Sequence, residues 1–165
     1  SGDFLSAQEA KILNHIDEIA DVEAHYMEDA DIAILAYGSV ARPALRAVRS
    51  AKGIREEAES RRGLLRRTLD RALRFRRKDE NPYSHLNLGM IKVNTVWPFP
   101  EKEIARLARH CKYVFVPEMN VGKYVREVDR CLKHSKVISL RKLGGDLHTP
   151  DEILASIARE VEAHE

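Results

Sequence analysis

The sequence predicts an α/β domain with three layers, α/β/α, built on a mostly parallel sheet of four to five strands with one helical insertion. Short apolar runs alternate with amphipathic segments, strand then helix, in four successive units. The connections between units are short, with one exception. The 165 residues, 44% hydrophobic and 33% charged, suffice for one core and are too few for two full domains. We therefore take residues 1–165 as a single domain with an insertion at residues 52–87.

The first elements follow from spacing and from helix-breaking residues. Residues 5–20 repeat isoleucine and leucine at intervals of three, four and seven, which predicts an amphipathic helix. A short strand around Ala24–Met27 could add an antiparallel edge to the sheet. Residues 31–37 form an apolar run that ends at Gly38, which is typical of a buried parallel strand. The next helix begins near Val40–Pro43, because proline is tolerated in the first turn.

The remaining units repeat this order. We expect strands over residues 89–96, 113–116 and 136–140, and helices over residues 101–110, 123–132 and from 150 toward the C-terminus. Thr149-Pro-Asp-Glu152 is a capping box with proline at the first helical position, so it marks where the last helix begins. Strand–helix units in series imply parallel strands with helices on both faces of the sheet.

The segment 52–87 departs from this alternation of strands and helices. It is too long for a plain loop in a compact domain. Residues 52–80 carry 11 Lys or Arg against 6 Asp or Glu, a local charge of +5 in a chain whose net charge is +2. Leucines recur among the arginines at near-helical spacing, which predicts a second helix, and residues 79–84 are expected to form the return loop.

Composition excludes several classes of protein. The chain has no run of 18 apolar residues, and its first 30 residues lack the pattern of a signal peptide, so we expect a cytoplasmic protein without a membrane segment. Mean hydropathy is −0.42, which suits a water-soluble protein. Cys111 and Cys131 are too few for a disulfide framework, a four-thiolate metal site or an iron–sulfur site, and both fall at core positions.

Ligands of open parallel sheets bind beyond the carboxyl ends of the strands, so candidate residues are sought there. Gly38 and Ser39 could offer backbone N–H groups to a phosphate, with help from Arg42. Neither GxGxxG nor GxxxxGK[ST] is present, however, so an ordinary strand–helix turn is the favoured interpretation. Glu118 and Asn120 lie on the expected exit loop 117–122, where hydrogen bonding within the loop or a subunit contact is favoured over ligand contact.

The Trp97-Pro-Phe-Pro100 sequence is the most unusual local feature. Its prolines fix an extended exit from the preceding strand, which leaves Trp97 and Phe99 partly exposed and indicates an interface. The seven histidines show no HExxH pattern and no zinc spacing, so most are expected at the surface or at helix caps. Because GxSxG and Ser-His-Asp patterns are also absent, the residues predict no catalytic centre and no metal site.

Five motifs taken in order resemble one family. They are Val22-Glu-Ala-His-Tyr-Met-Glu-Asp-Ala-Asp31, Ala36-Tyr-Gly-Ser-Val-Ala-Arg42, Thr95-Val-Trp-Pro-Phe-Pro100, Val116-Pro-Glu-Met-Asn120 and Leu143-Gly-Gly-Asp146. The series resembles the C-terminal domain of the α subunit of 2-oxoacid:ferredoxin oxidoreductases, most closely the 2-oxoglutarate branch. The resemblance covers residues 5–51 and 88–163 and implies a transketolase C-terminal-like fold. It does not explain the segment 52–87.

The resemblance implies a role within an oxidoreductase complex. That complex converts a 2-oxoacid to an acyl-CoA by oxidative decarboxylation and passes the electrons to ferredoxin. Thiamine diphosphate and Mg²⁺ would lie between the N-terminal domain of the α subunit and the β subunit, and iron–sulfur clusters would be held by other chains or domains. This chain would hold no cofactor, would be inactive alone, and would serve subunit assembly and border the approach of substrate and CoA. Carried over residue by residue, that border falls on Gly38, Ser39, Arg42, Glu118 and Asn120.

Two rival interpretations remain open. The arginine-rich segment 52–80 has the charge that nucleic-acid binding requires, but few aromatic residues accompany it, and a solvated helix face is favoured. Alternatively, the chain is a stand-alone assembly module that kept the fold without the enzyme. If the chain is instead what the resemblance implies, the acidic partners offered to the arginines are ferredoxin or the CoA phosphates.

Overall fold

The fold was described from a computed structural model, which describes residues 20–54, 81–118, 122–142 and 148–164. The strands are β1 (Val22–His25), β2 (Ile32–Tyr37), β3 (Leu88–Val93), β4 (Tyr113–Glu118) and β5 (Lys136–Arg141). The helices are the 3₁₀ turn η1 (Gly38–Val40), α3 (Ala41–Ala51), α5 (Glu101–Leu107), α6 (Lys123–Cys131) and α7 (Pro150–Glu162). The helices predicted over residues 5–20 and within the segment 52–87 lie outside the described residues.

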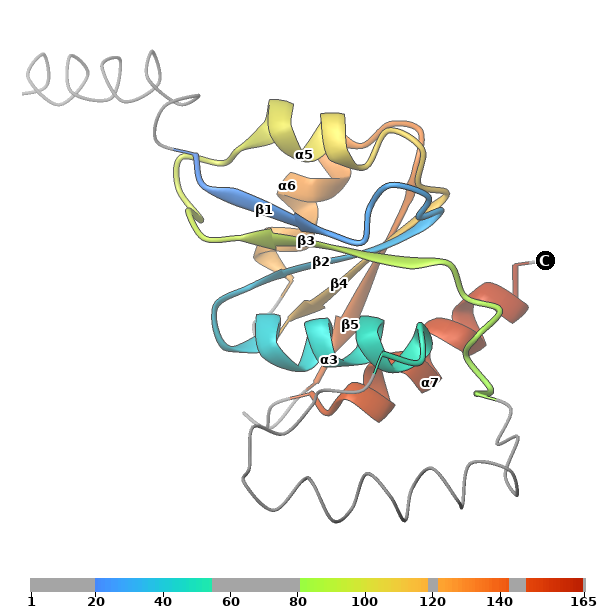
Figure 1. Cartoon of the computed structure of the whole chain (residues 1–165). Helices are drawn as coiled ribbons and strands as arrows, with labels where there is room; N and C mark the ends of the chain where they lie inside the picture. The colour runs from blue at the N-terminus through green and yellow to red at the C-terminus, as the bar shows by residue number, and fades with distance from the viewer. Residues whose placement is uncertain (1–19, 55–80, 119–121, 143–147, 165) are drawn as a thin grey trace, which may run out of the picture.

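The described strands form one sheet in the order β1-β3-β2-β4-β5 (Figure 1). β2 pairs in parallel with β3 and β4, and β4 pairs in parallel with β5. β1 is an edge strand antiparallel to β3, from Val22 opposite Val93 to His25 opposite Met90. The predicted α/β class and the mostly parallel sheet are therefore confirmed, including the antiparallel edge.

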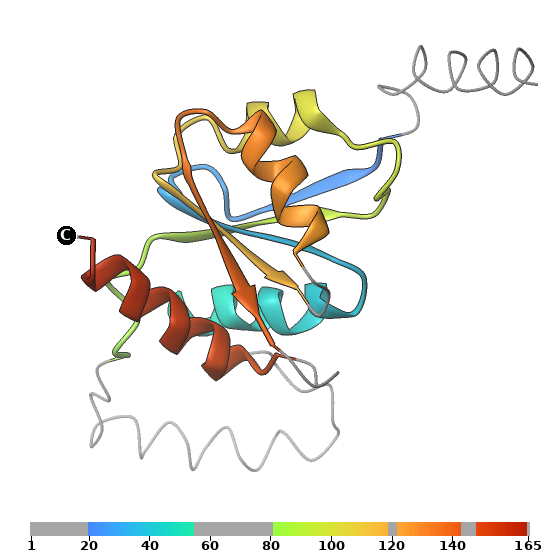
Figure 2. The same cartoon turned by 180° about the vertical axis from the view of Figure 1, so that it is seen from behind.

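Helices cover both faces of the sheet, as Figures 1 and 2 show from opposite sides. α3 and α7 pack on one face around Ile34, Phe115 and Ile157, all of which are fully buried. α5 and α6 pack on the other face around Leu35 and Val114. Side chains on both faces of the central strands are thus removed from water, which explains why every residue of β2 before Tyr37 is apolar.

The predicted capping box forms as expected at the start of α7. The backbone N–H of Glu152 donates to Oγ1 of Thr149 at 3.2 Å, and the Glu152 carboxylate accepts from the N–H of Thr149 at 2.8 Å. Pro150 occupies the first helical turn. The carboxylate also binds Nζ of Lys142 at 2.8 Å, which fixes α7 to the end of β5. These contacts lower the pKa of Glu152 to about 2.

Several element ends differ from the prediction. The strand predicted over residues 89–96 ends at Val93, and the helix predicted over residues 101–110 ends at Leu107. β4 continues through Pro117 to Glu118, two residues into what was predicted as an exit loop. β1 lies two residues earlier than predicted, since Tyr26 adopts a φ of +58°, which takes the chain out of the extended conformation.

The two described ends of the segment 52–87 are held together. The side-chain amide of Asn81 donates to the carbonyl oxygens of Ser50 and Ala51, each at 2.8 Å. The chain thus returns to the last turn of α3, where it left, and continues through Leu86 into β3. This closure supports the proposal that residues 52–87 are inserted into a single domain. Of the helices that the structure describes, none is long and apolar enough to span a membrane.

Candidate functional site at the carboxyl edge of the parallel strands

The site lies where β2 and β4 end. In the sheet β2 has β3 on one side and β4 on the other. The chain therefore leaves β2 toward β3 and leaves β4 in the opposite direction, toward β5, so the two connections diverge between β2 and β4. This divergence is the position at which open α/β sheets place their ligands. The segments leading into α3 and α6 start from it.

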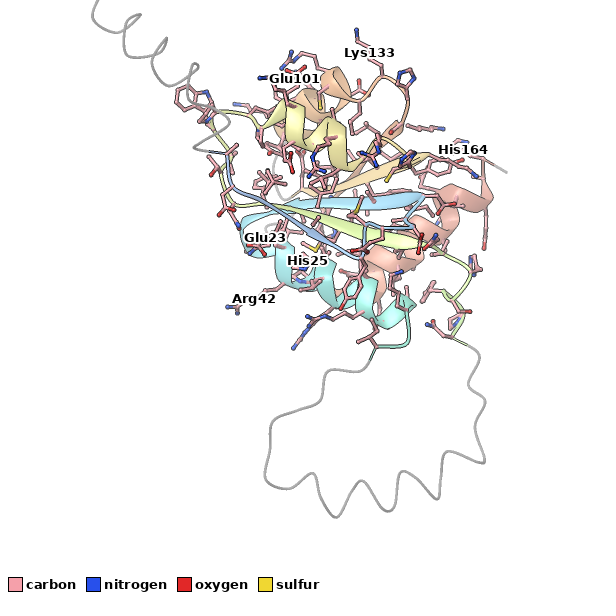
Figure 3. All side chains as sticks on the ribbon, turned by 45° about the horizontal axis from the view of Figure 1, so that its top comes forward. Glu23, His25, Arg42, Glu101, Lys133 and His164 are labelled. Carbon is pink, nitrogen blue, oxygen red and sulfur yellow. The ribbon has the colours of Figure 1, made fainter. Side chains whose placement is uncertain are left out.

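The segment after β2 exposes three of the predicted residues. Gly38 and Ser39 in η1 are exposed, and Arg42 projects from the first turn of α3 away from the body of the protein (Figure 3). Gly38 has a φ of +58°, which side-chain-bearing residues rarely adopt. A methyl group on Gly38 would meet nothing within 4 Å, so backbone conformation rather than space restricts this position.

Replacing Gly38 by valine is therefore expected to destabilise the domain by about 1–3 kcal/mol, because a β-branched residue must be forced into the left-handed region. Urea unfolding followed by circular dichroism measures the change. A melt that superimposes on that of the parent would mean that the turn relaxes to a negative φ at no cost.

Three aromatic side chains pack together beneath the carboxyl edge. The ring of Tyr124 in α6 lies 4.4 Å from that of Tyr37 and 5.4 Å, edge-on, from that of Phe99. Phe99 is therefore half-buried, whereas Trp97 leaves 62% of its surface in water and Val96 leaves 43%. The expectation of partial exposure thus describes Phe99, and Trp97 is the more exposed of the pair. Large exposed apolar side chains at one loop tip indicate a contact surface.

Glu118 is buried rather than exposed on a loop, with only 1% of its surface accessible. It is the last residue of β4, and its Oε1 accepts a hydrogen bond from the N–H of Val125 at 2.7 Å. α6 begins after Gly122, which has a φ of +75° and no side chain to cap the helix. Glu118 supplies the missing acceptor from the neighbouring strand, so the contact seen in the structure is local hydrogen bonding.

The rest of the Glu118 environment is poorly solvated. Its Oε2 and the hydroxyl of Tyr124 are buried without a hydrogen-bond partner among the described residues. Burial raises the pKa of Glu118, and backbone N–H groups at the start of α6 together with Arg141 oppose that rise. The Arg141 guanidinium lies against Gly122, where an added Cβ would come within 3.1 Å of it. Asn120 lies outside the described residues.

A polar network at the same edge was missed by the sequence analysis. Oε1 of Glu23 in β1 accepts from Nζ of Lys92 at 2.8 Å and from the amide of Asn94 at 2.7 Å. The Asn94 amide also donates to Asp21 at 3.0 Å. The hydrogen bonds that Glu23 accepts from Lys92 and Asn94 lower its pKa to about 2. Glu23 and His25 lie on the same face of β1 (Figure 3). Their alternation with Val22 and Ala24 was the available signal.

Titratable groups elsewhere are arranged for packing. Burial raises the pKa values of Cys111 and Cys131 to about 11, which suppresses their thiolate forms. Cys111 is buried in the core beneath α5 and α6, as predicted, whereas Cys131, the last residue of α6, is only half-buried against that core. His148 is an exception to the expectation of surface histidines, because only 7% of it is exposed. Within the described ranges, no three His, Cys, Asp or Glu side chains are grouped to hold a metal ion.

Comparison with known proteins places this geometry in context. Residues 63–153 match the family model described as pyruvate:ferredoxin oxidoreductase core domain II. The 2-oxoglutarate synthase subunit KorA of Methanothermobacter marburgensis is 36% identical over 89% of this chain and 32% of its own length. The subunit of the same name from Methanocaldococcus jannaschii is 34% identical over 87% of this chain and 30% of its own length. The chain therefore spans about a third of the curated relatives it matches.

A solved structure has the same fold. The 2-oxoglutarate:ferredoxin oxidoreductase from Magnetococcus marinus, with 2-oxoglutarate, coenzyme A and succinyl-CoA bound, superimposes with a TM-score of 0.62. The match covers 97% of this chain and 23% of that one, at 20% sequence identity. At that identity the likeness speaks for the architecture alone.

Proposed function

This chain belongs to the pyruvate:ferredoxin oxidoreductase core domain II family, and from that premise we propose that it works as the non-catalytic C-terminal domain of an α subunit in a 2-oxoacid:ferredoxin oxidoreductase. The observation that carries the proposal is the match along nearly nine-tenths of the chain to curated KorA subunits. Their name favours 2-oxoglutarate as the 2-oxoacid. The complex would then form succinyl-CoA and CO₂ from 2-oxoglutarate and CoA, with ferredoxin as electron acceptor.

In this proposal the chain supplies contact surfaces for other parts of the complex and no catalytic residue. Thiamine diphosphate, Mg²⁺ and iron–sulfur clusters would be held by the N-terminal domain of the α subunit, the β subunit and further domains. The carboxyl edge would contact those parts and border the path of 2-oxoglutarate and CoA. Exposed Arg42 and Trp97 support such a contact, since Arg and Trp are enriched among the residues that dominate interface energetics. Buried Glu118 would act through the start of α6.

Purification from the native source tests the assignment. The tagged chain is expected to co-purify with polypeptides that bind thiamine diphosphate and to yield a fraction that reduces ferredoxin when 2-oxoglutarate and CoA are both supplied. Omission of CoA is the control. Recovery of the chain with RNA would instead favour the nucleic-acid module, and recovery of the chain alone would favour the stand-alone assembly module.

Replacing Trp97 by alanine in the assembled complex tests the surface. We expect subunit association to weaken by about 2 kcal/mol or more, because a large exposed ring at an interface is commonly a dominant contact. Titration of subunits by analytical ultracentrifugation measures the change. Ile54→Ala is the matched control, since Ile54 is also an exposed apolar side chain but follows α3 at the opposite edge of the sheet. Equal effects of the two substitutions would contradict the assignment of the interface to the carboxyl edge.

A further inference from the structure

The outer edge of β5 borders a groove that the proposed function does not use. β5 is the last strand of the described sheet, and α7 runs beside it in the opposite direction (Figure 2). The space between them measures about 310 Å³. Its lining residues come from these two elements and from the segments next to them, and include Arg141, Lys142, His148, Glu152, Ser156 and Glu160.

The backbone of β5 offers hydrogen-bonding groups to this groove. In a parallel pair, alternate residues direct both N–H and C=O toward the neighbouring strand. The N–H groups of Lys136 and Lys142 donate to carbonyl oxygens at the two ends of β4, so the even-numbered residues of β5 face β4. Val137, Ser139 and Arg141 therefore direct their N–H and C=O groups along the outer edge, where the described sheet has no further strand.

One buried side-chain group lining the groove lacks a partner. The Nε2 of His148 is inaccessible to water and makes no hydrogen bond with the described residues. His148 is more than nine-tenths buried and lies directly before the start of α7. Unsatisfied buried polar atoms are costly, and a polar occupant that reaches them removes that cost.

The charges along β5 constrain what can dock. Its middle, from Val137 to Leu140, is apolar apart from one hydroxyl, whereas Lys136 and Arg141 are both exposed. A second copy of this chain would pair antiparallel about a two-fold axis and set these basic residues opposite one another, which is unfavourable. Of the acids in the groove, Glu152 binds Lys142 at 2.8 Å, whereas Glu160 lies 3.7 Å from Nε2 of His164. That nitrogen accepts from Nζ of Lys136 at 2.6 Å. A strand with acidic residues at both ends complements this edge.

We propose that the β5–α7 groove binds an extended peptide segment with an acidic residue at each end, which adds to the sheet beyond β5. The peptide backbone would pair with Val137, Ser139 and Arg141, and its alternate side chains would enter the groove beside Ser156. Lys136 and Arg141 would select the acidic ends. The exposed basic residues also protect the edge from indiscriminate pairing. The groove meets the carboxyl edge at Arg141 and otherwise lies along the outer edge of β5, and the inference stands whether or not the proposed enzyme is correct.

The test uses the whole chain and an N-acetylated, C-amidated hexapeptide, Asp-Val-Thr-Val-Thr-Glu, with a control peptide carrying lysine at both ends. We expect saturable binding of the acidic peptide with a dissociation constant of about 1 mM or lower. In ¹H–¹⁵N spectra the amides of Val137, Ser139 and Arg141 should shift most. The lysine peptide should bind at least about tenfold more weakly, since it presents like charges to the edge.

Two substitutions locate the interaction. Ser139→Pro removes an N–H that faces away from β4, so the sheet should persist while peptide affinity falls about tenfold or more. If that variant does not fold, Ser156→Trp fills the groove from half-buried Ser156 of α7 and should have the same effect. The proposal is overturned by shifts confined to other surfaces, by equal binding of the lysine peptide, or by sedimentation that reveals a dimer formed through β5.

Discussion

Replacing Gly89 by alanine is expected to destabilise the domain by about 3 kcal/mol, at the upper end of the cost of overpacking a core. A Cβ at Gly89 would lie 2.5 Å from the sulfur of Met27, 2.8 Å from Cβ of Ala30 and 2.8 Å from the carbonyl oxygen of Tyr26. The last contact involves a backbone already held at a φ of +58°. The sign is informative, because glycine-to-alanine changes inside strands are ordinarily stabilising.

Comparing the free energies of urea unfolding of Gly89→Ala and Gly38→Ala separates the effect of steric crowding at Gly89 from the effect of backbone strain at Gly38. Gly38 has a positive φ and open space, so alanine there should cost about 1 kcal/mol. Adding Met27→Ala to Gly89→Ala should recover only part of the loss, because the contacts with Ala30 and Tyr26 remain. Unchanged or raised stability of Gly89→Ala would show that residues 26–30 do not press on β3.

Strand positions were predictable from the sequence, but strand ends depended on partners. The apolar run before Gly38 identified β2, because both of its faces are buried. The sequence predicted a strand that includes Thr95 and Val96. The pairing of β3 with β2 ends where Tyr37 lies opposite Val93, however, and the N–H of Thr95 donates instead to the carbonyl of Asp21. The strand propensity of a residue does not depend on where the neighbouring strand ends, so it cannot predict this boundary.

Pro117 illustrates the opposite error. Proline reads as a strand terminator because it has no N–H to donate. In β4 the odd-numbered residues face β2, whose pairing with β4 ends at Phe115. The missing N–H of Pro117 therefore lies on the side where no ladder bond is required. Sequence alone could not reveal this asymmetry, so Glu118 was placed on a loop.

The candidate site divides in the same way. Gly38, Arg42 and Trp97 lie at the carboxyl edge where strand order predicted them, because parallel strands bring their carboxyl ends together. The role of Glu118 in capping α6 was not predictable, since the helix starts at a glycine without a capping side chain and the acceptor comes from a different element. The link from Glu23 to Lys92 joins residues 69 apart in sequence, and only the register of β1 against β3 brings them together.

Replacing Glu118 by alanine is expected to cost about 2–3 kcal/mol, because the N–H of Val125 loses its acceptor and the start of α6 is left uncapped. Glu118→Gln is the matched variant. It keeps a carbonyl oxygen for Val125 and removes a carboxylate that burial disfavours, so it should be as stable as the parent at low pH and more stable at neutral pH. Equal losses in the two variants would mean that the charge, rather than the acceptor, stabilises the fold.

The pH dependence of that difference has a definite sign. Burial raises the pKa of Glu118 above its ordinary value of 4.5, so between the two values the folded state binds more protons than the unfolded state. Parental stability must therefore fall relative to Glu118→Gln as pH rises through the folded pKa. Glu152 supplies the opposite control: its pKa is lowered to about 2, so the advantage of the parent over Glu152→Gln is present above 4.5 and lost as pH falls toward 2. Urea midpoints of the parent and both variants, measured at successive pH values, should therefore diverge in opposite directions, and parallel curves for the two variants would contradict a buried carboxyl at Glu118.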